Sequence, residues 1–153
     1  MEKSLCVAKA LYDMYYERFG SAMDEMKMHK LMYFVQRESL MNSKELLFEE
    51  PFYGWKFGPV LKSVRSEYMC AKPFEGVRAC LSDSGRALLK SVLDRYGELS
   101  SWTLSRMSHD EFSWKNARKG LEADENGDVK LMPEVMMLDA VRESLNRKNT
   151  VNV

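Results

Sequence analysis

The residues best suited to acid–base chemistry are three consecutive side chains, His109, Asp110 and Glu111. Histidine titrates near neutral pH, and a neighbouring carboxylate could orient its ring for proton transfer. Adjacent residues at a helix start point in different directions, however, so capping explains the cluster better. Asp110 or Ser108 would cap the helix, with Glu111 near its positive end. We therefore predict no catalytic residues, and a hydrolase using His109 and Glu111 is the alternative.

Metal and cofactor chemistry has little support in the sequence. A zinc site built from Cys70, Cys80 and His109 would need a fourth ligand and lacks the close paired spacing of structural zinc sites. With Cys6 the cysteines are odd in number and form no CxxC pair, which favours thiols in a reducing cytosol over a disulfide framework. We expect no metal and no cofactor.

The stretch Gly54-Trp55-Lys56-Phe57-Gly58 contains two glycines, but its aromatic residues favour packing and a bend over a phosphate-binding loop. The chain also lacks a Walker loop, a GxGxxG motif and a nucleophile elbow. The protein is therefore not expected to be an enzyme.

Chain length and net charge limit the number of domains and the classes of partner. A chain of 153 residues fits one domain, and its 23 basic and 23 acidic residues leave no net field toward nucleic acid or an anionic membrane. No apolar run approaches a membrane span, and the N-terminus does not resemble a secretory signal. We expect a cytoplasmic protein without a membrane partner.

Helical patterns dominate the chain. Helices are predicted from Ser4 to Phe19 with a stop at Gly20, from about Asp24 to Met41, and from Ser82 to Tyr96. Three further helices are expected: Glu98 to Met107 with Trp102 buried, a helix after Asp110, and about 133–148. The last one would open at Pro133 and face the core with five apolar residues, Val135, Met136, Leu138, Val141 and Leu145.

Short extended segments complete the predicted fold. Leu46 to Trp55 favours an extended passage, Gly58 permits a sharp bend, and Pro59 suits the first turn of a helix that ends by about Ala71. Phe74 to Leu81 is predicted as a short strand or hairpin arm, and Asn126-Gly127 marks a turn. The predicted fold class is mainly α (α+β), a single-domain multi-helix bundle with short β-strand or hairpin elements.

Two kinds of binding surface are compatible with this pattern. A winged arrangement around Phe74 to Ser82 could place Lys56, Lys62, Arg65 and Arg78 on one face for DNA, although zero net charge favours a solvated surface. Alternatively, some of the twelve methionines could line a groove for a protein partner, since methionine adapts to varied surfaces. Core packing is the simpler explanation for most of them.

Four blocks of the chain resemble the Panacea-domain family of SocA-like, phage-associated proteins. They are Lys30-Leu31-Met32-Tyr33-Phe34-Val35-Gln36, Leu47-Phe48-Glu49-Glu50-Pro51, Trp55-Lys56-Phe57-Gly58-Pro59-Val60, and Leu104-Ser105 through His109, Trp114 and Ala117. The block around Trp55 is the most specific. The resemblance covers about 23–121, and one departure is Gly54, where family members usually carry alanine before the tryptophan.

The resemblance implies one Panacea-like domain over 1–153, acting as the antitoxin of a bacterial or phage toxin–antitoxin system. Such a protein would neutralise a toxin, encoded by an adjacent gene, by binding it directly. Some relatives resemble proteolytic adaptors that deliver the toxin to an energy-dependent protease, and a DNA-binding regulator is the other alternative. The candidate partner-binding residues, as contacts or as supports of the contact surface, are Tyr33, Trp55, Lys56, Phe57 and Arg65. For Trp55 and Phe57 the alternative is burial.

Overall fold

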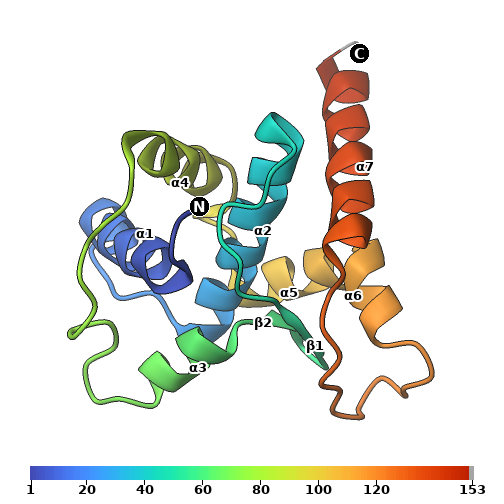
Figure 1. Cartoon of the computed structure of the whole chain (residues 1–153), viewed down its shortest axis with the longest axis horizontal. Coiled ribbons are helices and arrows are strands. Elements are labelled where there is room, and N and C mark those ends of the chain that lie inside the picture. The colour runs from blue at the N-terminus through green and yellow to red at the C-terminus, as the bar shows by residue number, and fades with distance from the viewer. Residues whose placement is uncertain (152–153) are drawn as a thin grey trace.

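A computed structural model describes residues 1–151, which form seven helices and one two-stranded antiparallel hairpin (Figure 1). This arrangement confirms the predicted mainly α fold with a small β element. The elements, in order, are α1 (Ser4–Phe19), α2 (Glu25–Ser43), β1 (Tyr53–Trp55), β2 (Gly58–Val60), α3 (Lys62–Tyr68), α4 (Asp83–Tyr96), α5 (Ser101–His109), α6 (Phe112–Ala117) and α7 (Pro133–Val151).

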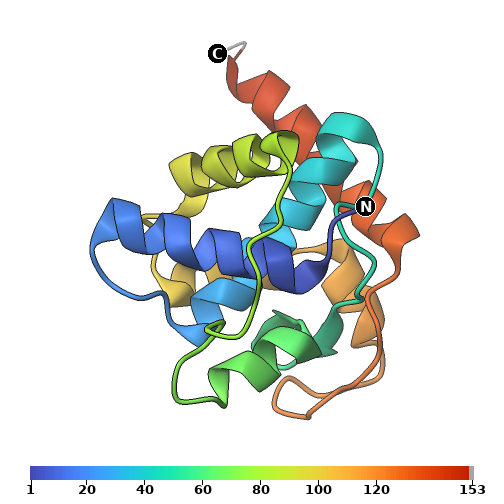
Figure 2. The ribbon, with the colours of Figure 1, turned by 60° about the vertical axis from the view of Figure 1, so that its left-hand side comes forward.

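Helix α2 is the centre of the molecule. Every residue from Lys27 to Leu40 is buried, and α2 contacts all six other helices as well as strand β2. Figures 1 and 2 show α1 and α4 on one side of α2 and α7 on the other. The predicted apolar residues of α2, among them Met28, Leu31 and Val35, are indeed in the core. The same helix also buries polar side chains around its remaining circumference, which is unusual and sets up both sites described below.

Local capping signals place several helix ends where the sequence predicts them. Helix α1 ends before Gly20, whose φ of 76° is the left-handed conformation that glycine adopts easily. The side chains of Asp24 and Ser82 accept hydrogen bonds from the backbone of Lys27 and Gly85, and so cap α2 and α4. Pro133 opens α7 as predicted.

The passage after α2 differs from the prediction in one respect. Pro59 does not begin a helix: it pairs with Gly54 inside the hairpin, and α3 starts only at Lys62. Gly58 has a φ of 121°, so it does supply the expected unusual backbone angle. The bend is therefore a tight β-hairpin that presents Lys56 and Phe57 at its tip.

Two further predictions about local structure are wrong. Residues 74–81 form turns and irregular backbone without a strand, so the wing that a DNA-binding arrangement would need is not formed. Trp102 is 63% exposed on α5, because Leu104 occupies the core-facing position of that short helix instead.

The cysteines also differ from expectation. Cys6 on α1 and Cys80 are joined in a disulfide, with their Cα atoms 5.6 Å apart, while Cys70 is free and exposed. The sequence separation of 74 residues gave no sign of this pairing. The bond ties the irregular segment before α4 to helix α1.

Helix α7 turns a different face to the core than predicted. Met136, Asp139 and Ala140 are buried against the body, whereas Leu138, Val141 and Leu145 are each about half exposed. The helix rotates because Asp139 has buried hydrogen-bond partners on α2 and α6. The hydrogen bonds of Asp139, and not the apolar periodicity of the sequence, thus decide which face of α7 is buried.

Candidate functional site

A cavity of about 350 Å³ opens between the hairpin and helices α2 and α3. We call it the hairpin pocket. Its walls come from segments that are far apart in the sequence but meet at the tip of the hairpin. The lining residues are Glu25, Met26, His29, Lys30, Trp55, Lys56, Phe57, Val60, Arg65 and Asn126.

The hairpin is fixed from behind by α5 and α6. Ser105 donates a hydrogen bond to the Phe57 carbonyl at 2.7 Å, and the Trp114 indole donates to the Trp55 carbonyl at 2.8 Å. A Cβ added at Gly54 would lie 2.9 Å from the Ala117 Cβ, so glycine permits this close approach of strand and helix. The turn therefore presents Lys56 and Phe57 from a rigid base.

One rim of the pocket is a chain of polar contacts. Arg65 pairs with Glu25 at 2.7 Å, and the other Glu25 oxygen lies 3.0 Å from His29 Nε2. The Leu61 N–H donates to His29 Nδ1 at 3.2 Å, so Nδ1 is an acceptor and Nε2 carries the hydrogen. Burial lowers the pKa of His29, and the hydrogen bond from His29 lowers the pKa of Glu25. The rim thus holds a neutral histidine and a carboxylate whose two oxygens are both engaged.

Lys30 lies deeper in the same pocket and is only 1% exposed. Its ammonium donates to the Pro59 carbonyl at 3.4 Å, which is long for such a bond. Burial lowers its pKa to about 7, partly opposed by the carboxylates of Glu25 and Asp24. Lys30 is therefore a buried amine near its titration point.

The structure brings four of the five candidate partner-binding residues to this pocket. Trp55 and Lys56 are half-buried, Phe57 is 48% exposed, and Arg65 is exposed on α3. Trp102 extends the aromatic surface, since its ring meets that of Phe57 edge to face at 6.2 Å. The alternative of complete burial for Trp55 and Phe57 does not hold.

Tyr33 does not reach the pocket. It is fully buried on α2, so it has no surface for contact with a partner and could act only as a support. Its hydroxyl donates to Glu111 at 2.7 Å and lies 2.9 Å from Asp139, and burial raises its pKa well above the ordinary value. Tyr33 belongs to a second polar site.

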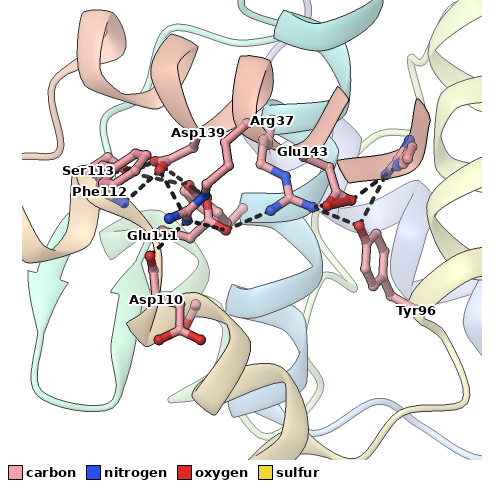
Figure 3. A network of polar contacts seen from close by, with 12 residues as sticks. Arg37, Tyr96, Asp110, Glu111, Phe112, Ser113, Asp139 and Glu143 are labelled. Carbon is pink, nitrogen blue, oxygen red and sulfur yellow. Dashed lines mark hydrogen bonds and ion pairs between the residues drawn. The ribbon is translucent and has the colours of Figure 1, made fainter. Parts of the chain in front are cut away.

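That second site is a buried network between α2, α4, α6 and α7 (Figure 3). The Arg37 guanidinium donates to Glu111 and to the Tyr96 hydroxyl, both at 2.7 Å, and also lies 3.5 Å from Glu143. Arg147 extends the network to Glu38 and to the same Tyr96 hydroxyl. A cavity of about 390 Å³ opens beside Arg37, Glu111 and Glu143. Because the contacts of the network hold α7 against the central helix, we interpret the network as structural.

The network also caps α6 in a way the sequence did not indicate. Neither Asp110 nor Ser108 caps this helix, and Glu111 occupies the cap position without a capping bond. The Asp139 carboxylate of α7 instead accepts from the Phe112 and Ser113 backbone N–H groups at 2.6 and 3.1 Å. A residue distant in sequence therefore takes the role that local residues usually fill.

The network predicts a pH dependence of stability. Burial raises the pKa of Glu111 to about 7, so the folded protein holds this proton more tightly than the unfolded chain does. The contribution of Glu111 is therefore greatest below about pH 4.5 and is lost as the pH rises toward 7. The free energy of unfolding of the wild type should therefore fall by roughly 1 to 3 kcal/mol over that interval, and Glu111→Gln should remove this fall. Urea unfolding at several pH values measures it.

Glu75→Gln, at an exposed position, is the control and should leave the pH dependence of stability unchanged. Equal profiles for wild type and Glu111→Gln would contradict this assignment.

The sequence-level acid–base candidates do not come together. The Glu111 carboxylate points into the buried network, whereas the His109 ring stacks on Trp114 at 4.2 Å. Within residues 1–151, no hydrogen bond joins these two side chains, and no three His, Cys, Asp or Glu side chains could share a metal ion. None of the helices in that range combines the length and apolar character needed to cross a membrane.

Sequence reasoning missed the three polar lining residues of α2, Glu25, His29 and Lys30, and did not include Val60 or Asn126. The signal available was spacing: Glu25 and His29 are four residues apart on one helix face, and Lys30 directly precedes the apolar run from Leu31 to Val35. Neither feature is informative until the helix is known to be buried on all sides.

Comparison with known proteins addresses the same part of the chain. The family model described as antitoxin SocA-like, Panacea domain, matches residues 28–115, from the first turns of α2 into α6. No curated protein and no solved structure matches the chain. The matched range contains the whole hairpin and five other lining residues or contacts of the pocket, His29, Lys30, Arg65, Trp102 and Ser105. Because the match spans more than half of the 153 residues, the chain belongs to the antitoxin SocA-like, Panacea-domain family.

Proposed function

We propose that this protein is an antitoxin that neutralises a protein toxin by binding it directly, with the hairpin pocket and its rim as the contact surface. The observation that carries this proposal is the convergence of Trp55, Lys56, Phe57 and Arg65 on one pocket within the range that the family model matches. Aromatic residues and arginine dominate the energetics of protein interfaces. The toxin would be encoded by an adjacent gene, and the complex would form in the cytoplasm.

The form of the pocket supports binding of a protein segment. Phe57 lines the cavity, the 63% exposed Trp102 adds apolar surface outside it, and the Lys56 ammonium lies 5.3 Å from the Phe57 ring centre. Ser105 and Trp114 fix the hairpin backbone at Phe57 and Trp55, so little loop ordering opposes association. The separation of His109 from Glu111 supports action by binding without catalysis.

Co-expression with the product of the adjacent reading frame tests the proposal. Growth rescue together with co-purification of the two chains is the expected result. Rescue without a stable complex would favour a proteolytic adaptor or a repressor, and a gel shift with promoter DNA at low salt would identify the repressor. A neighbour that is not toxic would contradict the antitoxin role for this gene pair.

Variants of the purified complex test the surface itself. Trp55→Ala should weaken toxin affinity by about 30-fold or more, and Lys56→Glu by about tenfold, because both remove contacts at the centre of the proposed interface. Tyr16→Ala on α1 and Lys90→Glu on α4 are matched controls at exposed positions, expected to change affinity less than about twofold. Isothermal titration calorimetry measures the dissociation constants. Unchanged affinity for folded Trp55→Ala and Lys56→Glu would rule out this surface.

A further inference from the structure

Lys30 has the weakest polar contacts of the buried cations in residues 1–151, which are Lys27, Lys30, Arg37 and Arg118. Arg37 pairs with Glu111 at 2.7 Å, Arg118 donates to three backbone carbonyls, and Lys27 donates to the Tyr15 hydroxyl at 3.1 Å. Among residues 1–151, Lys30 forms no ion pair and makes one long hydrogen bond to a carbonyl. A buried ammonium without a counter-ion destabilises the folded state, so its presence in a pocket indicates a role outside folding.

The backbone of the hairpin is shaped to the lysine. A Cβ at Gly58 would lie 2.6 Å from Lys30 Cε and 3.0 Å from Nζ, so glycine lets the turn close over this side chain without displacing it. The φ of 121° at the same residue is likewise accessible to glycine and strained for others. The hairpin thus closes over the lysine, which is a lining residue of the pocket although only 1% of it is exposed.

The charge of the pocket is unbalanced in one direction. Its lining contains three cationic side chains, Lys30, Lys56 and Arg65, and the single carboxylate of Glu25. Both Glu25 oxygens are already engaged, by Arg65 and His29, and His29 is neutral. The remaining positive charge therefore suits an anionic group entering from outside.

We propose that the hairpin pocket recognises a carboxylate of the protein partner, with Lys30 as the residue that pairs with it. This inference rests on the proposed function, because a carboxylate is the anion that an unmodified protein offers, either on an Asp or Glu side chain or at its C-terminus. Trp55, Phe57 and Val60 would pack against the apolar part of the entering residue, and Lys56 and Arg65 would steer it.

The state of the amine fits this role. Burial holds the pKa of Lys30 at about 7, and a bound carboxylate would favour the charged form and raise it. The titratable groups around Lys30 are Asp24, Glu25 and His29 of α2 and His109 of α5, with Lys56 and Arg65 on the rim. Above pH 7, binding should therefore be accompanied by proton uptake.

Selection from random seven-residue peptide libraries tests the proposal on the purified full chain without the toxin. One library is displayed with its C-terminus fused, which reports acidic side chains, and the other with a free C-terminus, which reports the terminal carboxylate. Wild type is expected to enrich Asp or Glu at one position, or a free terminus, and Lys30→Met should lose that enrichment. Lys90→Met, an exposed lysine on α4, should select as wild type does.

Single peptides make the result quantitative. Replacing the selected Glu or Asp by its amide, or amidating the terminus, should lower affinity for wild type by about tenfold or more and leave affinity for Lys30→Met nearly unchanged. Equal selection by wild type and Lys30→Met, or no enrichment of carboxylates by wild type, would overturn the proposal. If toxin binding is lost in Trp55→Ala and retained in Lys30→Met, the contact surface stands and carboxylate recognition fails.

Discussion

Arg37→Met is expected to lower the free energy of unfolding by about 3 to 5 kcal/mol. Arg37 supplies the central cation of the buried network, bonding Glu111 and Tyr96 and lying over the Phe34 ring at 4.7 Å. Its loss leaves the Glu111 carboxylate, 4% exposed, with only the Tyr33 hydroxyl as a close partner. A buried charge without its counter-ion accounts for most of the expected cost.

Urea unfolding at pH 8, where Glu111 is ionised, measures this effect. Arg142→Met is the matched control, because Arg142 is one-third exposed and lies 3.8 Å from Glu111 and from Asp139, so its loss should cost less than about 1 kcal/mol. Adding Glu111→Gln to Arg37→Met should recover part of the lost stability, since it removes the unpaired charge. A loss of less than about 1 kcal/mol for Arg37→Met would show that the network does not support the fold.

Lys30→Met is expected to do the opposite and stabilise the protein at neutral pH by about 2 to 4 kcal/mol. The folded protein releases the Lys30 proton near pH 7, whereas the unfolded chain holds it to about 10.5. That difference in pKa corresponds to roughly 5 kcal/mol of destabilisation at 1.36 kcal/mol per pKa unit. The substitution also removes the hydrogen bond to Pro59, and this loss reduces the net gain in stability. Methionine keeps the apolar stem and removes the buried charge.

The sign of the pH dependence is a second test of the same variant. Because the unfolded state binds more protons between about pH 7 and 10.5, wild-type stability gains from Lys30 as the pH rises through that interval. The advantage of Lys30→Met should therefore be largest at pH 7 and below, and disappear near pH 10.5. Lys90→Met should show no such trend. A Lys30→Met protein that is less stable than wild type at pH 7 would show that the lysine stabilises the fold, contrary to this prediction.

The opposite effects expected for Arg37→Met and Lys30→Met distinguish a structural role for Arg37 from a functional role for Lys30. Arg37 is buried with partners and supports the fold, whereas Lys30 is buried without a counter-ion beside a pocket. A gain in stability that accompanies a loss of binding is the usual relation between a fold and its functional site. Lys30→Met would display that relation in one substitution.

The sequence by itself determined the elements whose signals are local. Asp24, Ser82 and Pro133 mark helix starts through bonds or backbone angles within one turn, and Gly20 and Gly58 mark positions that need unusual φ values. The convergence of Trp55, Lys56 and Phe57 also follows from their adjacency in one short block. Such signals depend on neighbours along the chain, so they can be read without the fold.

Only the tertiary structure decided which polar groups are buried and what they contact. Tyr33 and Asp139 are 106 residues apart, and their bond, with the cap that Asp139 provides to α6, turns Leu138 and Leu145 outward against the apolar pattern. The place of Lys30 in the pocket likewise depends on the hairpin that closes over it. The physical reason is that a charge or hydroxyl is stable inside a protein only with its partners, and these partners come from distant segments that local patterns do not identify.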